Sequence, residues 1–230
     1  MIAERSKPAV VLVSGGLDSA TTLALAIEGG FVVHALSVDY GQRHALELER
    51  AAEVAASCGA ASHRTARCDL SFFSGSALTD PATSVPRGRD EHQIGSEIPV
   101  TYVPARNTIL LSLALGWAEV LGAHDLFIGA NAVDYSGYPD CREEYLREFE
   151  RLATLATRAG VEGATFRVHA PLLSMTKAKI VQEAVRLGVD LARTLSCYEP
   201  GDDGRPCGEC DACRLRARGF REAGLEDPAL

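Results

Sequence analysis

One stretch near the N-terminus, VVLVSGGLDSATT over Val10 to Thr22, limits most strongly the folds that this chain can adopt. Its first four residues are apolar and uncharged, which is typical of a strand buried on both faces of a parallel sheet. Gly15 and Gly16 follow, and because they lack Cβ atoms they allow a sharp turn and a close approach of backbone N–H groups to a ligand. From Leu17 to Ile27 the apolar spacing becomes helical. The stretch therefore predicts a strand, a turn and a helix in immediate succession.

The turn between this strand and this helix has the features of a phosphate site. A helix N-terminus offers free N–H donors and the positive end of the helix dipole, and Ser14 and Ser19 add hydroxyl groups. We therefore expect an anion, most naturally a phosphate, to bind here. The alternative is an ordinary glycine turn in which Asp18 or Ser19 only caps the helix. The turn matches neither the GxxxxGK[ST] nor the GxGxxG pattern of other nucleotide sites.

Length and charge restrict the class of protein. A chain of 230 residues suits one α/β domain with an appendage and is short for two domains. The formal net charge of −8 argues against a broad electrostatic contact with RNA or DNA, so a small-molecule substrate is expected. The N-terminal residues MIAERSKPAV lack the apolar segment of a signal peptide, and no window approaches the roughly 18 apolar residues of a membrane span. We therefore expect a cytoplasmic protein that contacts neither nucleic acid nor membrane.

Apolar patterns and glycine stops predict the remaining elements. Strands are expected at 31–38, 62–70, 125–130 and 165–170, and helices at 43–58, 110–121, 141–158 and 177–187, the last capped by Ser174 or Thr176. Arg64 and Arg67 place the strand 62–70 at an edge. The helix 110–121 is apolar nearly all round, so it is expected to pack on two sides. The alternation predicts a doubly wound, mostly parallel sheet with helices on both faces.

Three segments between these elements are candidates for function. The polar residues 39–42 end the second strand, at the edge where open α/β sheets bind ligands. The loop 131–140 is dense in hydrogen-bonding and aromatic groups, which suits recognition of a flat polar heterocycle. The segment 71–99 lacks periodicity, and we interpret it as a lid. Lys177 opposes the dipole of its helix, so it either contacts phosphate or is merely solvated.

Four cysteines near the C-terminus form the clearest metal motif. Cys197, Cys207, Cys210 and Cys213 give CxxCxxC preceded by one further cysteine, and four thiolates can close a tetrahedral zinc site with a structural role. An iron–sulfur cluster is the competing interpretation. Of the other cysteines, Cys141 lies near the expected site, where we interpret it as a structural thiol rather than a nucleophile.

Motifs along the whole chain indicate a family. SGGLDS resembles the pyrophosphate loop (PP-loop) of the ATP pyrophosphatase superfamily, whose members activate a carbonyl or carboxylate oxygen by transferring AMP to it. The complete chain resembles the 7-cyano-7-deazaguanine synthases (the QueC family) in SGGLDS at 14–19, SVDYGQRH at 37–44, YVPARN at 102–107, GANAVDYSGYPDCR at 129–142, SCY at 196–198 and CGECDACRLRARGFREAG at 207–224. The stretch 81–89 departs from the family pattern, which puts the lid in doubt but not the chemistry.

This resemblance implies an activity. It implies a C–N bond-forming ligase that converts 7-carboxy-7-deazaguanine and ammonia to the nitrile preQ0, with ATP and Mg²⁺, in queuosine biosynthesis. It also implies an adenine nucleotide α-hydrolase-like fold, with an ATP-binding domain at 1–195, a zinc-binding helical segment at 196–230, and a homodimer.

The resemblance also suggests roles for individual residues. Lys177, Arg106 and Asp134 are the expected catalytic residues, and Asn107, Tyr135, Tyr138 and Asp140 are expected to bind the heterocycle, with Asp134 beside them. Zinc is expected at Cys197, Cys207, Cys210 and Cys213. The residues expected to bind ATP are Val13, Ser14, Gly15, Gly16, Leu17, Asp18, Ser19, Ala20, Thr21, Thr22 and Leu23.

Two other functions remain open. The first is a PP-loop enzyme that acts on tRNA, such as a thiolase or lysidine synthase, which would need a basic RNA-binding surface or an added domain. The second is a zinc-containing nucleotide-binding module without catalysis, which would bind ATP without turnover.

Overall fold

The computed structural model describes residues 7–44, 46–89, 94, 98–133 and 138–229. Its elements are, in chain order, β1 (Pro8–Leu12), α1 (Leu17–Glu28), β2 (Val32–Asp39), α2 (Leu46–Cys58), β3 (Ser62–Arg67), α3 (Arg106–Leu121), β4 (Asp125–Phe127), the 3-10 turn η1 (Pro139–Cys141), α4 (Glu143–Ala156), α5 (Arg158–Val161), β5 (Arg167–His169), α6 (Lys177–Arg186), the 3-10 turn η2 (Leu191–Arg193) and α7 (Asp211–Ala223).

The strands form one parallel sheet in the order β3-β2-β1-β4-β5. Val10 of β1 pairs with His34 of β2 on one side and with Leu126 of β4 on the other. The chain first moves outward from β1 to β3 and then returns to add β4 beside β1. The carboxyl ends of β1 and β4 thus form the switch point at which such sheets bind ligands. The predicted doubly wound sheet and the edge position of β3 are confirmed.

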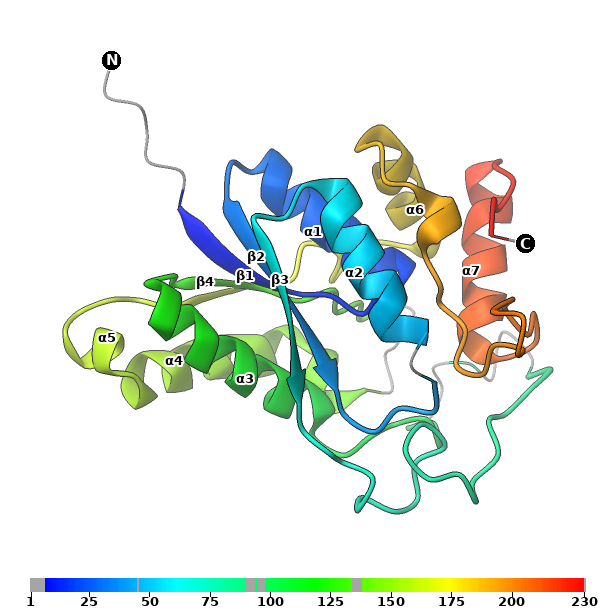
Figure 1. Cartoon of the computed structure of the whole chain (residues 1–230), viewed down its shortest axis with the longest axis horizontal. Coiled ribbons are helices and arrows are strands. Elements are labelled where there is room, and N and C mark those ends of the chain that lie inside the picture. The colour runs from blue at the N-terminus through cyan, green and yellow to red at the C-terminus, as the bar shows by residue number, and fades with distance from the viewer. Residues whose placement is uncertain (1–6, 45, 90–93, 95–97, 134–137, 230) are drawn as a thin grey trace.

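Helices cover both faces of this sheet (Figure 1). Alternate β1 residues point to opposite faces. Val10 and Leu12 join the core beneath α3 and α4, whereas Ala9 and Val11 join the core beneath α1, α2 and α6. Helix α7 packs on α6, outside the layer that covers the sheet. A Cβ atom at Gly219 of α7 would lie 2.4 Å from Cγ of Lys177, so this close helix contact requires a glycine.

Several element boundaries differ from those expected. Helix α2 begins at Leu46 rather than Arg43, because Arg43 is used in tertiary hydrogen bonds. The helix expected at 141–158 is divided into η1, α4 and α5. Helix α3 is buried along one face only, with Val120 82% exposed, so the expectation of packing on two sides is wrong. No helix among the described residues is long and apolar enough to span a membrane.

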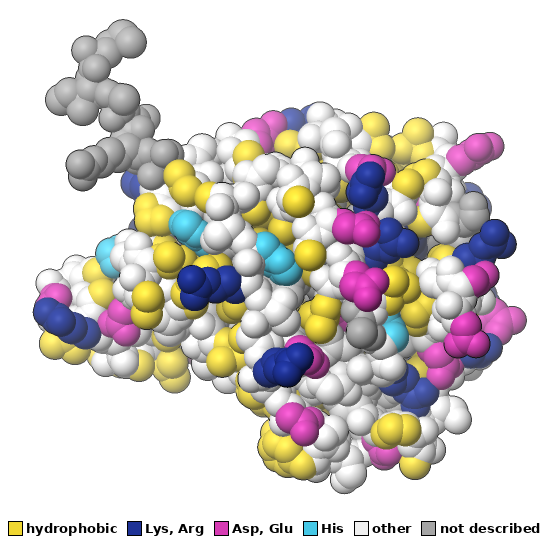
Figure 2. Space-filling model, in the orientation of Figure 1, with side chains coloured by type: hydrophobic (Ala, Val, Ile, Leu, Met, Phe, Trp, Pro, Cys, Tyr) yellow, Lys and Arg dark blue, Asp and Glu magenta, His cyan; other side chains and the backbone are white. Residues whose placement is uncertain are grey.

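The long connection between β3 and α3 packs against the cysteine segment. Ala77 and Val85 lie in one buried cluster with Cys197, Cys210 and Cys213. Arg87 also forms an antiparallel bridge with Cys210. The described part of the segment expected to be a lid is therefore anchored to the C-terminal part of the chain. Elsewhere, Lys and Arg side chains on the face shown in Figure 2 are interspersed with Asp and Glu.

Candidate functional site

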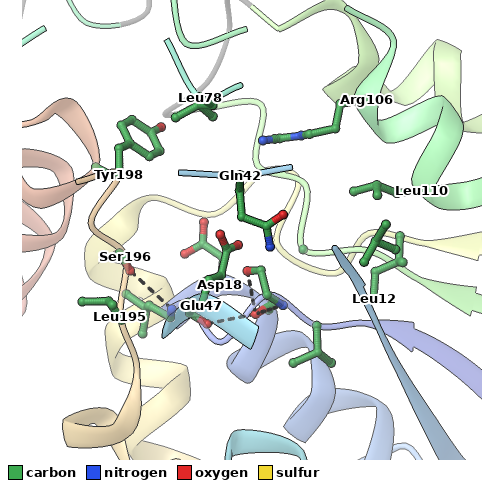
Figure 3. A pocket seen from close by; sticks show the side chains of 18 of the residues that line it. Leu12, Asp18, Gln42, Glu47, Leu78, Arg106, Leu110, Leu195, Ser196 and Tyr198 are labelled. Atoms are coloured by element: carbon green, nitrogen blue, oxygen red, sulfur yellow. Dashed lines mark hydrogen bonds between the residues drawn. The ribbon is translucent and has the colours of Figure 1, made fainter. Parts of the chain in front are cut away.

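A cleft opens at the switch point of the sheet, with about 1520 Å³ of empty space that includes the part open to solvent (Figure 3). Leu12 and Ile128 line its base from the ends of β1 and β4, and Tyr40 lines it from the end of β2. The turn at residues 14–19, called the phosphate loop from here on, forms one wall of the cleft. The first turn of α3 forms another. The loop, the ends of the strands and α3 therefore face one shared space.

The phosphate loop has the predicted strand, turn and helix. Ser19 Oγ accepts hydrogen bonds from the Ser14 backbone N–H at 3.1 Å and from Ser14 Oγ at 3.2 Å, which closes the turn. Gly15 has a φ of 77°, and a Cβ atom there would lie 2.7 Å from the Ala51 backbone nitrogen. Both its conformation and the approach of α2 therefore require glycine.

The C-terminal segment supports this loop directly. The Leu195 N–H donates to the Gly15 carbonyl at 3.0 Å, and Ser196 Oγ accepts from the Leu17 N–H at 3.4 Å. The N–H groups of Ser14 and Leu17 are thus engaged within the protein, so an anion would use other donors of the turn. The segment that leads into the cysteine cluster also lines the cleft beside this loop.

Lys177 is inside the cleft and not on the surface. Its side chain is only 4% exposed, and Nζ contacts the two Asp18 carboxylate oxygens at 2.9 and 2.8 Å. Thr176 caps its helix by accepting from the Lys179 N–H. The interpretation of Lys177 as a solvated lysine is therefore wrong. Its position beside the phosphate loop leaves phosphate binding as the functional interpretation.

Arg106 forms the opposite wall at the start of α3. Its guanidinium lies 5.8 Å from the Tyr40 ring centre. Burial lowers the pKa of Arg106, but the nearby Tyr40, Tyr138 and Tyr198 hydroxyls and the Glu47 carboxyl outweigh burial and raise it. Arg106 is therefore a permanent cation in the cleft, suited to a carboxylate or phosphate.

The residues expected to bind the heterocycle are only partly brought together. Tyr138 and Asn107 line the cleft, and Tyr138 Oη bonds Thr101 Oγ1 at 2.8 Å. Asp140 lies behind Asn107, where its Oδ2 accepts from the Asn107 N–H at 3.0 Å and its backbone carbonyl accepts from Asn107 Nδ2 at 3.1 Å. Asp140 is not among the residues that line the cleft. The two further expected residues of this loop, Asp134 and Tyr135, lie outside the described residues.

Cys141 is a buried thiol beside this pair of residues. Asn107 Nδ2 lies 3.3 Å from its Sγ, and burial raises the pKa of Cys141 to about 11. A thiol with such a pKa is protonated at neutral pH and is a poor nucleophile. The structure therefore fits the interpretation of Cys141 as a structural thiol.

The four expected metal ligands converge. The Sγ atoms of Cys197, Cys207, Cys210 and Cys213 all lie within 4.8 Å of one another. Hydrogen bonds from the Cys210 and Cys213 thiols lower the pKa of Cys197 well below its usual value. Its sulfur also accepts from the Cys207 and Glu199 N–H groups at 3.2 and 3.4 Å. A metal binds the thiolate form, so this cluster could hold a metal ion.

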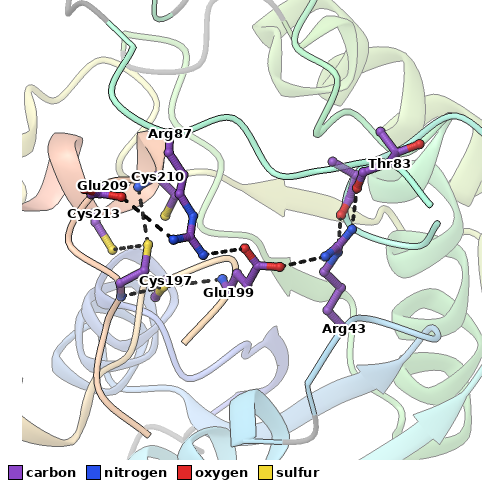
Figure 4. A network of polar contacts seen from close by, with 10 residues as sticks. Arg43, Thr83, Arg87, Cys197, Glu199, Glu209, Cys210 and Cys213 are labelled. Carbon is purple, nitrogen blue, oxygen red and sulfur yellow. Dashed lines mark hydrogen bonds and ion pairs between the residues drawn. The ribbon is translucent and has the colours of Figure 1, made fainter. Parts of the chain in front are cut away.

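An ion-pair network joins the cysteine cluster to the segment 71–89 (Figure 4). Glu199 accepts from Arg43 at 2.7 Å and from Arg87 at 2.8 Å. Arg43 also donates to the carbonyl oxygens of Ala77, Asp80 and Thr83. The partly exposed Arg43 guanidinium thus holds several turns of a segment that has no helix or strand among its described residues.

Comparison with known proteins identifies the family. A model described as Queuosine biosynthesis protein QueC matches residues 8–224. The chain belongs to the QueC family. Two similar curated relatives are both named 7-cyano-7-deazaguanine synthase. The one from Thiobacillus denitrificans is 62% identical over 220 residues, which cover 96% of each chain. The one from Xanthomonas oryzae pv. oryzae (strain PXO99A) is 64% identical over 222 residues, again 96% of each chain.

Solved structures of other proteins share the fold at low sequence identity. NMN synthetase from Francisella tularensis is 15% identical with a TM-score of 0.50, over 96% of this chain and 79% of that one. A predicted subunit of a tRNA methyltransferase from Methanocaldococcus jannaschii is 16% identical with a TM-score of 0.51, over 78% of this chain and 76% of that one. At such low sequence identity, these similarities are evidence about the fold of this QueC family member and not about its function.

Some cleft residues were not singled out from the sequence. Glu47, Ser196 and Tyr198 line the cleft of this QueC family member, and Arg43 and Glu199 hold its outer wall. Residues 39–42 were expected to face the nucleotide, and Tyr40 and Gln42 do line the cleft. Glu47 could have been found from the sequence by its position, because it lies three residues after the SVDYGQRH motif, in the first turn of α2.

Proposed function

We propose that this chain converts 7-carboxy-7-deazaguanine to 7-cyano-7-deazaguanine with ATP and ammonia, as a ligase that forms a C–N bond in queuosine biosynthesis. Membership of the QueC family and the names of the curated relatives support this activity. The single structural observation that carries the proposal is that the phosphate loop and the wall with Arg106 and Tyr138 face one cleft. ATP and a carboxylated heterocycle would meet there.

The chemistry explains why ATP is needed. A carboxylate resists attack by ammonia because it is electron-rich and has no good leaving group. Transfer of an adenylyl or phosphoryl group to its oxygen creates that leaving group, and ammonia then gives the amide. Activation of the amide oxygen in turn allows the nitrile to form. A site that holds both reactants in line and stabilises the developing charge can support both steps without a covalent enzyme intermediate.

The phosphate loop and two cations would position the ATP. Residues 13–23 would hold the phosphates through N–H and hydroxyl groups, and Mg²⁺ would bridge phosphate oxygens. Lys177 and Arg106 would stabilise negative charge on phosphate or carboxylate. Lys177 is already held toward the loop by Asp18, and Asp134 completes the proposed catalytic set.

The heterocycle would lie against the wall opposite the loop. Tyr138 and Asn107, which line the cleft, would contact it, and Tyr135 is a further proposed contact. Asp140 would act through Asn107, since it supports that side chain from behind. An aromatic ring beside amide groups suits a flat base with polar edges.

The cysteine cluster would hold a structural zinc ion. Four sulfur ligands leave no open position for substrate, so the ion would stabilise residues 196–230 rather than take part in the reaction. Ser196, at the start of this segment, accepts from the Leu17 N–H of the proposed ATP-binding part, residues 1–195. We further propose that the protein is cytoplasmic and forms a homodimer. Light scattering coupled to size-exclusion chromatography would measure its molar mass in solution and so test the homodimer.

Mass spectrometry of the products tests the function. The purified protein is incubated with 7-carboxy-7-deazaguanine, MgATP and ammonium, and one component is left out in each control. We expect a nitrile that requires both ATP and ammonium, and the released nucleotide would show how the oxygen is activated. Survival of substrate and ATP with folded, zinc-loaded protein would contradict the proposal, and tRNA would be the next substrate to test.

A further inference from the structure

Glu47 is a carboxyl group of the cleft with no role in the scheme above. It lies in the first turn of α2 and lines the same cleft as the phosphate loop and Arg106. One turn further along α2, the Ala51 backbone rests against Gly15 of the loop. Figure 3 shows Glu47 directed into the cleft, as are Gln42 and Asp18. Glu47 is therefore close to the place where an activated carboxylate would lie between ATP and Arg106.

Glu47 differs from the other acidic group that lines the cleft. Asp18 is engaged by both of its oxygens with Lys177. Among the residues that the structure describes, none forms a hydrogen bond or ion pair with the Glu47 carboxyl. Gln42 lines the same cleft, and its Nε2 is buried without a partner among those residues, while its Oε1 accepts from the Tyr40 N–H at 2.8 Å. The Glu47 carboxylate and the Gln42 amide nitrogen thus have no hydrogen-bond partner among the described residues, so both can bind a small polar reactant.

The nucleophile of the proposed reaction presents a problem that such a carboxylate would solve. Ammonia is mostly ammonium at neutral pH, and ammonium has no lone pair with which to attack. A carboxylate that lines a partly enclosed cleft attracts this cation and can accept its proton. The heterocycle and ATP supply no group of this kind, since both are anionic and their oxygens are engaged in activation.

We propose that Glu47 binds the incoming ammonium ion and accepts its proton during amide formation. This inference rests on the proposed function. The N–H bond of ammonium breaks, its electrons stay on nitrogen, and Glu47 becomes a carboxylic acid. The nitrogen lone pair then forms the C–N bond at the activated carboxyl carbon. The bond from this carbon to the bridging oxygen breaks, AMP or phosphate leaves with the electron pair, and the added nitrogen gives a further proton to water in the open part of the cleft, which leaves the neutral amide.

The surroundings of Glu47 suit this task. Burial raises the pKa of Glu47 to about 7, against a smaller lowering by Arg106. A proton acceptor is most effective when its pKa is near the working pH. The other titratable or charged groups that line the cleft are Tyr40, Arg43 and His44 before α2, Asp18 on α1, Arg106 on α3, Tyr138, Cys141, Lys177 on α6, Cys197, Tyr198, and Arg216 on α7.

His44 is the competing acceptor. Its Nδ1 is buried without a partner among the described residues, and its Nε2 lies 3.3 Å from the Cys197 carbonyl. Glu47 is favoured because a carboxylate attracts ammonium and a neutral imidazole does not. The variants Glu47→Gln and His44→Gln separate the two.

The test compares two nucleophiles. Hydroxylamine is largely a free base at neutral pH, so it needs no proton acceptor before attack. We expect Glu47→Gln to lower kcat/KM for ammonium by about 10²-fold or more while changing kcat/KM for hydroxylamine only a few-fold. Glu49→Gln is the matched control, because Glu49 lies in the same turn of α2 and is exposed. Glu47→Asp should recover part of the ammonium reaction.

Two further measurements make the result specific. Exchange of labelled pyrophosphate into ATP, for adenylyl transfer, or of labelled ADP into ATP, for phosphoryl transfer, should survive in Glu47→Gln with the carboxylate substrate but without ammonium. The acid limb of the wild-type pH profile of kcat/KM for ammonium, set by Glu47 near pH 7, should be absent from this variant.

Three outcomes would overturn the inference: equal losses with both nucleophiles, no loss with either, or a selective loss of the ammonium reaction in His44→Gln instead. Wild-type protein that forms no product with either nucleophile would instead contradict the proposed function, so the two failures are distinguishable.

Discussion

Lys177 and Asp18 are joined by two hydrogen bonds of 2.8 and 2.9 Å, which link the start of α6 to the start of α1. The lysine is 4% exposed and the aspartate 20%. This pair orients the ammonium group toward the phosphate loop before any ligand binds. It also means that Lys177 contributes to the fold as well as to the proposed chemistry.

Replacement of Lys177 by methionine should therefore affect both activity and stability. We expect kcat to fall at least about 10²-fold, and the free energy of unfolding to fall by about 1–3 kcal/mol, since Asp18 is left without its partner in a partly buried site. Lys179→Met, at an exposed position on the same helix, should change neither. Steady-state kinetics and denaturant unfolding measure the two effects. An unchanged kcat in Lys177→Met would remove this residue from the mechanism.

The contact of α7 with Lys177 predicts that an alanine in place of Gly219 lowers both the stability of the protein and its affinity for ATP. A Cβ atom at Gly219 would overlap the Lys177 side chain, so Gly219→Ala should destabilise the protein by about 1–3 kcal/mol and lower ATP affinity by displacing Lys177. Gly116→Ala on α3 is the matched control, because a Cβ atom there meets nothing within 4 Å. It should be neutral or stabilising by up to about 1 kcal/mol. Equal effects of the two substitutions on thermal unfolding would contradict this account.

Removal of metal should weaken the nucleotide site as well as the C-terminal segment. Leu195 and Ser196 contact the phosphate loop and directly precede Cys197, so loss of the cluster should loosen one wall of the cleft. We expect chelation, or Cys207→Ser, to lower the melting temperature and to reduce ATP affinity in calorimetry. Cys58→Ser, outside the cluster, should retain the metal and the affinity. Full ATP affinity in metal-free protein would show that the two sites are independent.

Glu199 should control the order of the segment 71–89. Without its carboxylate, Arg43 and Arg87 lose the group that joins them. Glu199→Gln should therefore make this segment more sensitive to limited proteolysis and raise KM for the heterocycle, because Leu78 of this segment lines the cleft. Glu209→Gln is the control, since Glu209 is exposed and lies 3.8 Å from Arg87. Identical cleavage patterns in wild type and Glu199→Gln would exclude this role.

The partly buried position of Glu47 in the cleft predicts a pH dependence of stability. Burial raises its pKa from the ordinary value of 4.5 to about 7 in the folded state, so the folded state binds more protons than the unfolded state between these two pH values. The contribution of Glu47 to stability is thus lost as pH rises from about 4.5 to about 7. Glu47→Gln should be more stable than wild type at pH 8, with a smaller difference at pH 4. Denaturant unfolding at both pH values measures this, and a less stable Glu47→Gln at pH 8 would contradict it.

Local patterns predicted much of the fold. The strand, glycine turn and helix at Val10 to Ile27 are found within one or two residues of their expected bounds. The spacing of the cysteines predicted a cluster whose sulfur atoms do converge. These features depend on residues close in sequence, where backbone geometry limits the possible arrangements.

Features that depend on distant residues could not be predicted in the same way. The strand order was not predictable, because local periodicity does not show that β4 lies beside β1. The pairing of Lys177 with Asp18 and the placement of Asp140 behind Asn107 likewise require the assembled tertiary structure. Arg43 has a high helix propensity but lies outside α2, because its bonds to the segment 71–89 outweigh that preference.

The contacts of Leu195 and Ser196 with the phosphate loop have a consequence for the chain as it leaves the ribosome. Strands β1, β2 and β3 and their helices can pair early, since they are adjacent along the chain. The wall that these two residues complete exists only after nearly the whole sequence has been translated. ATP therefore has no finished site on a nascent chain, and its stabilisation of the native state begins only when synthesis is almost complete.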